Sequence, residues 1–343
     1  MNFARQNMAL PRPEINSKAA RALGLCSGGL DSMLAGCLLR KQGLDVTWIT
    51  FETPFFSSAK ARQASTLTGI PLIVKNITAT YLKMLVNPPC GYGKHMNPCM
   101  DCHALMFRLA GAVMQKEGYD FLFSGEVLGQ RPMSQTRPSL RYVEKNSGFD
   151  GYVLRPLSAQ RLAETIPEKE GLVDRSLLLN FTGRTRKPQI QLAKEFGITK
   201  YPAPAGGCLL TDARFSERLK DLFDHQPGYE ETDLELLKYG RHLRLDETHK
   251  IIVGRTKDDN DHICRHYRPA MDILIKTQKI PGPVVLLPHG GPAEIIQKAA
   301  SICVGYTKAG PEAEVEVLVK TPQGSETFTA TGIPPAEVQP YLV

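Results

Sequence analysis

The sequence predicts an α/β protein whose main domain is a doubly wound parallel sheet, followed by a second, smaller α/β domain. Three observations support this prediction. The chain has 343 residues, more than one hydrophobic core usually serves. Between residues 22 and 124, short apolar runs alternate with segments of helical periodicity, which is typical of parallel strands joined by helices. Beyond Cys208, short strand-like runs surround one clear helix.

The elements of the main domain follow in order along the chain. Strands are expected at residues 22–26, 46–51, 71–74 and 121–124, because each run is short, apolar and bounded by turn residues. Helices are expected at residues 33–39, 57–69, 101–116 and 187–197, where apolar side chains recur at helical spacing. Residues 87–98 hold three prolines and two glycines, so they should form a loop.

The second domain is predicted from less regular signals. A charged helix is expected at residues 214–223, strands at 250–253 and 284–287, a helix at 293–303, and a terminal hairpin formed by 314–320 and 326–330. The expected divisions are a leader over residues 1–20, a main domain over 21–210, a connecting helix over 211–233 and the small domain over 234–343.

Composition restricts the class of protein. The net charge of +7 and a pI near 8.9 favour an anionic partner, although many enzymes without a polymer ligand carry as much charge. The first residues lack the apolar core of a secretory signal, and no stretch reaches the roughly 18 apolar residues of a membrane span. We therefore expect a cytoplasmic protein with no membrane contact, whose eight cysteines stay reduced.

A phosphate-binding turn is predicted between the first strand and the first helix. The motif SGGLDS at residues 27–32 places glycines where backbone N–H groups can approach an anion, at the positive end of a helix dipole. The turn lacks the GxxxxGK[ST] pattern of kinase-like NTPases, so transfer of a terminal phosphoryl group is not indicated. The simpler alternative is an ordinary Gly-Gly helix entry capped by Ser27.

Three cysteines have informative surroundings. Cys99 and Cys102 form a CxxC at a helix entrance, and Cys208 lies in an AGGC turn. Three thiolates can hold a four-iron cluster and leave one iron open for sulfide. Three alternatives remain: a zinc site with His95 or His103 as fourth ligand, a metal-free pair that passes persulfide sulfur through a disulfide, or packed thiols.

Basic residues gather at two places in the main domain. Arg184, Arg186 and Lys187 precede a helix, where they could neutralise ATP phosphates or an RNA backbone. A second group follows the last predicted strand of that domain and comprises Arg131, Arg137 and Arg141. The alternative is ordinary solvated surface charge.

Four motifs, SGGLDS, NPCMDCH, SGEVLGQ and PAGGC, resemble in that order the tRNA thiouridine synthases of the PP-loop family, over roughly residues 20–210. The resemblance implies a Rossmann-like fold of the adenine nucleotide alpha hydrolase type, with ATP and Mg²⁺ as cofactors. It implies a 4Fe-4S cluster on Cys99, Cys102 and Cys208, with Asp31, Cys99 and Cys208 as catalytic residues. The residues that it places around the nucleotide are Ser27, Gly28, Gly29, Leu30, Asp31, Ser32, Gly125, Glu126 and Gln130.

The activity implied is ATP-dependent thiolation of a tRNA uridine. The carbonyl oxygen would be adenylated, and sulfur from inorganic sulfide or a cysteine desulfurase would then replace AMP. Family members of the 4-thiouridine type carry a THUMP domain before the PP-loop, for which the 26 residues ahead of Ser27 leave no room, so the modified uridine stays open. The alternatives are an amide-forming ligase acting on a small molecule and a non-catalytic RNA-binding protein. The prediction is compatible with a homodimer.

Residues 239–260 resemble the RNA-binding domain of NFACT proteins, with an arginine after glycine, a basic strand and a VGR turn. The resemblance implies tRNA as partner. The residues that it implies face RNA are Arg241, His242, Arg244, Lys250 and Arg255. The alternative is a small module that only docks on the first domain.

Overall fold

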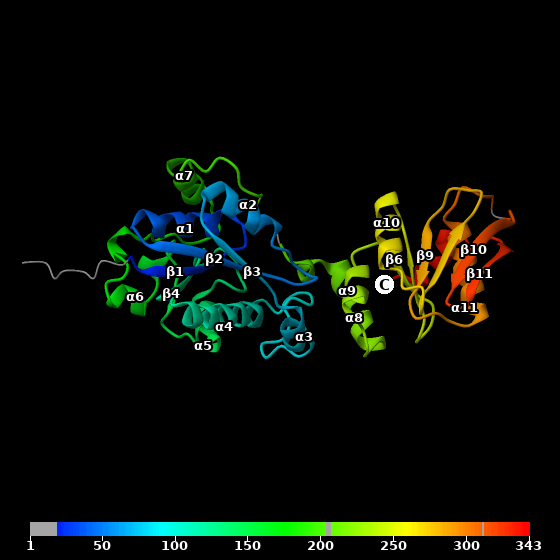
Figure 1. Cartoon of the computed structure of the whole chain (residues 1–343), viewed down its shortest axis with the longest axis horizontal. Helices are drawn as coiled ribbons and strands as arrows, with labels where there is room; N and C mark the ends of the chain where they lie inside the picture. Colours follow the sequence, from blue (N-terminus) through cyan, green and yellow to red (C-terminus); the bar gives the residue numbers. More distant parts are fainter. Residues whose placement is uncertain (1–18, 204–206, 311) are drawn as a thin grey trace, which may run out of the picture. The chain divides into compact units, whose positions relative to one another are not determined.

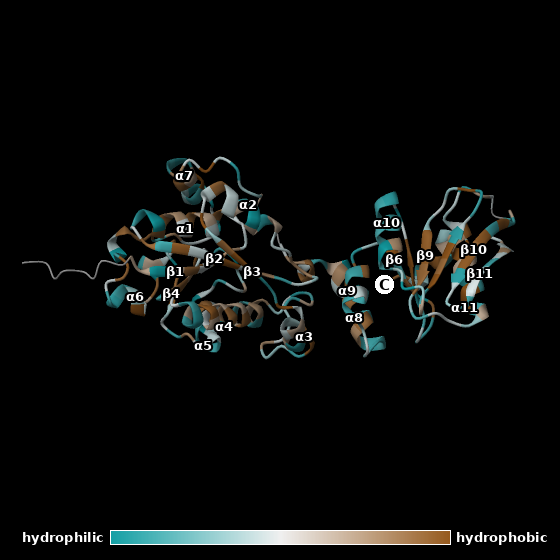
Figure 2. Cartoon of the chain, in the orientation of Figure 1, coloured by the Kyte–Doolittle hydropathy of each residue, from teal (hydrophilic) through white to brown (hydrophobic). Residues whose placement is uncertain are grey.

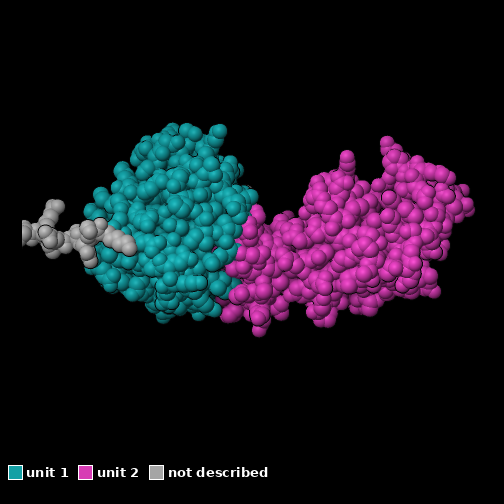
Figure 3. Space-filling view, in the orientation of Figure 1, with its two compact units in different colours: residues 1–50, 58–75, 103–203 teal, residues 51–57, 76–102, 204–343 magenta. Residues whose placement is uncertain are grey.

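The computed structural model describes residues 19–203, 207–310 and 312–343 (Figure 1). The leader predicted over residues 1–20 therefore lies outside the described residues except for its last two positions. The chain divides into two compact units (Figure 3). The first holds residues 1–50, 58–75 and 103–203, and the second holds residues 51–57, 76–102 and 204–343. The second unit thus takes in the predicted loop with its CxxC.

A five-stranded parallel sheet runs in the order β3-β2-β1-β4-β5, which confirms the predicted doubly wound sheet. Its strands are β1 Arg21–Leu25, β2 Asp45–Glu52, β3 Leu72–Asn76, β4 Phe121–Ser124 and β5 Val153–Leu154. The chain begins in the middle of the sheet and continues outward on both sides. The order therefore reverses between β1 and β4, and the carboxyl ends of those two strands define the ligand-binding edge.

The structure has a helix close to each of the four positions predicted in this part of the chain, and three further helices that were not predicted. The helices of this part of the chain are α1 Leu30–Lys41, α2 Ala59–Thr68, α3 Thr78–Val86, α4 Cys99–Glu117, α5 Arg137–Ser147, α6 Ile166–Lys169 and α7 Lys187–Glu195. Three 3₁₀ turns lie at η1 Ala159–Arg161, η2 Arg175–Leu177 and η3 Leu209–Thr211. Helix α1 is buried along most of its length, and its apolar side chains pack with Trp48 and Phe123 in the core.

The second sheet has six strands in the order β11-β10-β8-β9-β7-β6, and its pairs are antiparallel. Its strands are β6 Arg241–Arg244, β7 Lys250–Val253, β8 Ile273–Thr277, β9 Val284–Leu287, β10 Val315–Thr321 and β11 Gly324–Ala330. Figure 2 colours β9 as strongly apolar, in agreement with its complete burial. The predicted hairpin is the pair β10 and β11.

The helices of the second unit's C-terminal part are α8 Ala213–His225, α9 Glu231–Leu236, α10 Lys257–His266, α11 Ala293–Gly305 and α12 Pro335–Val338, followed by η4 Gln339–Tyr341. The final residues return to β6, where Leu342 bridges to Leu243 and the Val343 N–H donates to the His242 carbonyl at 3.0 Å. In the part of the chain that the structure describes, no helix has the length and apolar character needed to span a bilayer.

Candidate functional site

The SGGLDS turn has a backbone that only glycine permits at its second position. Gly28 has φ of 73°, and a Cβ there would lie 2.2 Å from the carbonyl carbon of Lys60. Gly29 is the N-cap of α1, and the Ser32 hydroxyl donates to its carbonyl at 2.8 Å. The first N–H groups of α1 are therefore presented at the ligand-binding edge of the sheet. Leu30 is buried in the core, so only its backbone is available to a nucleotide.

The loop after β4 lies against the same turn. A Cβ on Gly125 would be 2.4 Å from the carbonyl carbon of Asp31 and from the amide nitrogen of Ser32. Such close backbone contact brings together two of the motifs that the sequence separates by almost a hundred residues. The two loops occupy the reversal point of the strand order, as expected for an open α/β sheet.

Asp31 is partly paired and partly free. Its Oδ2 accepts a hydrogen bond from Gln130 Nε2 at 2.7 Å, while its Oδ1 is buried and has no hydrogen-bond partner. Burial raises the pKa of Asp31, and the Gln130 hydrogen bond and the charges of Arg186 and Arg131 oppose that rise. Asp31 Oδ1 can therefore bind a cation or accept a hydrogen bond from a ligand.

Two further buried polar atoms close to this network also lack partners. Gln189 Nε2 donates to Gln130 Oε1 at 3.0 Å, but the Gln189 Oε1 has no partner although the residue is only 1% exposed. Arg186 Nε is buried and unpaired as well. A buried polar atom without a partner costs about 1–3 kcal/mol. Three such atoms within one network therefore indicate that the site is completed by a ligand, an ion or water.

The carboxylate of Glu126 is bound by two basic side chains inside the protein. Its Oε2 lies 3.0 Å from Arg155 Nε and also accepts from the Ser124 hydroxyl, and its Oε1 lies 2.9 Å from His103 Nδ1. Burial disfavours the charge of Glu126, but Arg155 and His103 outweigh it and hold the pKa at about 2. The side chain is engaged inside the protein, and contact with a nucleotide stays a prediction.

Gln189 and Arg155 are members of the site that the sequence did not reveal. Gln189 lies on α7, directly after the basic residues that were noted. Arg155 follows the apolar pair of β5 and is 3% exposed. An arginine inside an apolar run indicates a buried ion pair, so the sequence contains a signal from which a buried Arg155 could be predicted.

The three cysteines of interest come together in the second unit, around Tyr81 of α3. Cys99 and Cys102 occupy the first turn of α4, and Cys208 is the N-cap of η3. Burial raises the pKa of Cys102 above that of an ordinary thiol, and the nearby Cys208 and Cys99 raise it further. Burial likewise raises the pKa of Cys208 to about 11. The thiols lie within electrostatic reach of one another although Cys208 is distant in sequence.

The three thiols supply candidate ligands, and the structure leaves the predicted metal untested. Among the residues described, no group of three or more His, Cys, Asp and Glu side chains is arranged to hold a metal ion. Three thiols are nevertheless the ligand type that iron-sulfur clusters and zinc select. His103, one of the alternatives for a fourth zinc ligand, has its Nδ1 bonded to Glu126. The cluster therefore stays a prediction.

Several basic residues expected to face RNA have internal partners. His242 and Lys250 are buried: His242 Nε2 lies 3.1 Å from the Tyr239 carbonyl oxygen, and Lys250 Nζ lies 3.0 Å from Asp221 of α8. Arg244 makes two hydrogen bonds to the same carboxylate, at 2.9 and 2.8 Å. Arg244 and Lys250 therefore bind Asp221 and connect α8 to the second sheet, and we call this contact the α8 anchor.

The remaining basic residues are more accessible. Arg241 lies 4.8 Å from the ring centroid of Tyr306, and Arg255 is exposed beside Asp259. Arg184 and Lys187 are exposed, whereas Arg186 is half-buried near Asp31. The other exposed arginines of the first unit are Arg131, Arg137 and Arg141, the last of which pairs with Asp150. RNA contact by any of these residues stays a prediction.

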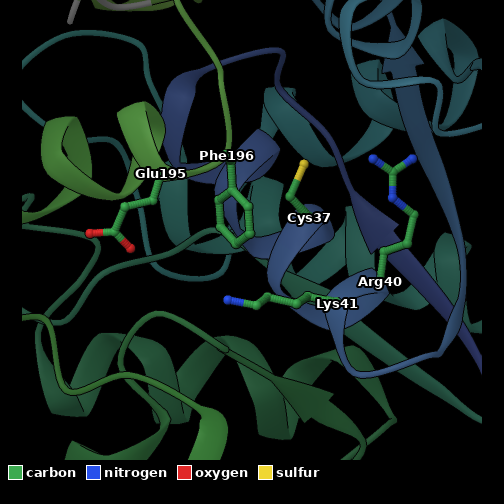
Figure 4. A pocket seen from close by; sticks show the side chains of 5 residues that line it. All are labelled: Cys37, Arg40, Lys41, Glu195 and Phe196. Carbon is green, nitrogen blue, oxygen red and sulfur yellow. The ribbon is translucent and has the colours of Figure 1, made fainter.

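A shallow hollow of about 310 Å³ lies elsewhere in the first unit (Figure 4). It is lined by Cys37, Arg40, Lys41, Glu195 and Phe196. The first three belong to the last turn of α1, whereas the phosphate-binding turn lies at the start of that helix. A helix of this length extends roughly 18 Å, so the hollow is not part of the phosphate site.

Comparison with known proteins finds one family match in the N-terminal part of the chain and another in the C-terminal part. Residues 17–166 match the family model of the thiamine biosynthesis protein ThiI, and residues 240–342 match that of the NFACT protein RNA-binding domain. A probable tRNA sulfurtransferase of Moorella thermoacetica is 33% identical over 153 residues, which are 43% of this chain and 38% of that protein. One of Oceanobacillus iheyensis is 29% identical over 157 residues. The chain thus spans less than two fifths of the length of these relatives.

Two other similarities are more distant. The tRNA-specific 2-thiouridylase MnmA of Pseudomonas fluorescens is 24% identical over 68% of this chain and 63% of that protein. The structure of NMN synthetase from Francisella tularensis covers 64% of this chain and 84% of its own, with 16% identity and a TM-score of 0.35.

The parallel sheet and its SGGLDS turn belong to a domain of the PP-loop type. More particularly, the chain combines a ThiI-like PP-loop domain with a C-terminal NFACT RNA-binding domain, and is a distant relative of the ThiI-type tRNA sulfurtransferases.

Proposed function

We propose that this chain thiolates a uridine of tRNA at the expense of ATP, which it cleaves to AMP and pyrophosphate. The observation that carries the proposal is the network around the phosphate-binding turn, where the buried atoms Asp31 Oδ1, Gln189 Oε1 and Arg186 Nε have no partner. A bound nucleotide with its cation would supply partners for an unpaired carboxylate oxygen and an unpaired guanidinium N–H together. Similarity to tRNA sulfurtransferases and the RNA-binding domain support tRNA as the substrate.

The first step is adenylation of the uridine carbonyl. The carbonyl oxygen attacks the α-phosphorus of ATP, pyrophosphate leaves, and the uridine N3 proton is released. The helix α1 N-terminus and the Gly28 turn would bind the pyrophosphate, since the first N–H groups of a helix have no partner within the helix and favour an anion. Arg186 would neutralise charge that develops on the phosphates. Preorganised donors of this kind commonly supply the largest part of catalysis in such a site.

The second step replaces oxygen by sulfur. Hydrosulfide adds to the activated carbon, AMP leaves, and N3 carries its proton again, so the two steps balance without an oxidant. Asp31 would hold Mg²⁺ through its free oxygen, and the metal would stabilise charge on the phosphates. Cys99, Cys102 and Cys208 would hold an iron-sulfur cluster, which would supply sulfide to this step. The sulfur donor is inorganic sulfide or a cysteine desulfurase.

The test is an anaerobic assay with ATP, sulfide and tRNA, in which pyrophosphate release and thiolated nucleosides are measured together. Asp31→Asn is expected to lower both rates by roughly 100-fold or more, because it removes the carboxylate charge from the site. Asp174→Asn is the matched control, since Asp174 caps a surface turn of the same unit and should leave both rates unchanged. Pyrophosphate release that needs no RNA would instead favour an amide-forming ligase. No ATP cleavage at all would favour a non-catalytic RNA-binding protein.

A further inference from the structure

Two of the three clustered thiols, Cys99 and Cys102, each have a polar side chain beside the sulfur. The first donor is Asn97, whose Nδ2 donates to Cys99 Sγ at 3.2 Å. The second is Tyr81, whose hydroxyl lies near the Cys102 thiol and favours its charged form. Sulfur is a weak acceptor as a neutral thiol, and it becomes a good acceptor when it carries negative charge. The arrangement of donors is therefore informative about the sulfur that the site holds.

The orientation of the Asn97 amide is fixed by its own loop. The His95 backbone N–H donates to Asn97 Oδ1 at 3.1 Å, so the NH₂ group must be the end that faces the sulfur. The Gly93 N–H also donates to the Asn97 carbonyl at 3.0 Å. A Cβ on Gly93 would lie 2.5 Å from Asn97 Nδ2, so a larger residue there would displace the amide from this position.

The Tyr81 ring is held as firmly. The residue is 1% exposed, and its ring centroid lies 5.8 Å from that of Phe55 and 5.3 Å from that of Phe56. The Phe55 carbonyl accepts from the Leu209 N–H at 3.0 Å, which ties this aromatic cluster to the residue after Cys208. The phenol cannot turn away from Cys102 without disturbing that packing.

We propose that Asn97 and Tyr81 are positioning residues of the thiol site, which donate hydrogen bonds to the sulfurs of Cys99 and Cys102 when these bind metal as thiolates. The inference rests on the proposed function and deepens it. Neutral donors around a metal site hold its ligands in place and tune the metal, and their loss typically weakens metal binding 10–100-fold.

The test uses Co²⁺ as the probe, titrated anaerobically into the full-length, metal-free protein and followed by its sulfur-to-cobalt charge-transfer absorption. Tyr81→Phe and Asn97→Asp should each weaken Co²⁺ binding by roughly 10-fold or more. At saturating Co²⁺ the band should move to longer wavelength, because a thiolate without its hydrogen bond gives up electron density more readily. A merely structural role would leave the position of the band unchanged. Asn97→Ser is the second variant at that position, should Asn97→Asp fail to fold.

The matched control is Tyr92→Phe, which removes a tyrosine hydroxyl in the same loop. That hydroxyl donates to the Leu85 carbonyl at 2.6 Å and to no sulfur, so Co²⁺ binding and band position should equal those of the wild type. Wild-type values in the Tyr81 and Asn97 variants would overturn the inference. So would a wild-type protein that binds no Co²⁺ through sulfur, even if it thiolates RNA. Conversely, the expected spectra in a protein that adds no sulfur to RNA would refute the proposed function and leave the inference standing.

Discussion

Replacing Arg155 by leucine would leave a buried carboxylate without its main partner. Arg155 and Glu126 are 3% and 7% exposed, and Arg155 Nε lies 3.0 Å from Glu126 Oε2. Breaking a buried ion pair by removing one partner typically costs about 3–5 kcal/mol, because the remaining charge stays away from water. The lowering of the Glu126 pKa from 4.5 to about 2 corresponds to about 3 kcal/mol, in agreement with that range.

The stabilisation by Glu126 has a defined pH dependence. A carboxyl group whose pKa is lowered on folding stabilises the native state above its unfolded pKa, and this stabilisation is lost as pH falls through the folded pKa. The window therefore runs from pH 4.5 down to about pH 2. Arg155→Leu should cost about 3–5 kcal/mol at pH 7, and the difference from wild type should shrink by about 2 kcal/mol at pH 3.

Urea unfolding followed by Trp48 fluorescence measures this cost in the correct unit. Trp48 is the single tryptophan of the chain and is fully buried in the core of the first unit. Arg141→Leu is the control, since its ion pair is 50% exposed and should be worth at most about 1 kcal/mol. Combining Arg155→Leu with Glu126→Leu should recover much of the loss. A cost below about 1 kcal/mol, or one that is equal at pH 3 and pH 7, would refute the reasoning.

Single substitutions test the phosphate-binding turn and the contact of α8 with the second sheet. Gly28→Ala should reduce ATP-dependent pyrophosphate release by roughly 100-fold, since the new Cβ would meet the Lys60 backbone. Gly43→Ala, at a similar positive φ but with nothing within 4 Å, should keep the wild-type rate. Asp221→Asn should lower the hydrogen-exchange protection of β6 and β7 at pH 7 by about 2 kcal/mol, and unchanged protection would contradict the anchor. Because the pKa of Asp221 is lowered to about 2, the wild-type protein should lose the same protection between about pH 4 and pH 2.

The parallel sheet and the phosphate-binding turn could be predicted from the sequence because both depend on local signals. Alternating apolar runs and helical periods specify strands joined by helices, and Gly28 at a left-handed backbone position marks the turn between them. The position of that turn at the reversal of the strand order then follows from general rules of open α/β sheets. The gathering of Cys208 with the CxxC came from resemblance rather than from spacing, which left three alternatives open.

What only the tertiary structure decided is which polar side chains meet. The basic residues Arg244 and Lys250 look alike on paper whether they face water or a carboxylate, and Asp221, their partner, lies 29 residues from Lys250. In the same way, no neighbouring residues in the sequence indicate that Asn97 and Tyr81 lie beside the sulfurs. Nor do they indicate that Glu126 forms an ion pair with Arg155. Periodicity in a sequence specifies which face of an element is buried. The partner on the other side of that face is chosen by packing between segments that the chain brings together only when it folds.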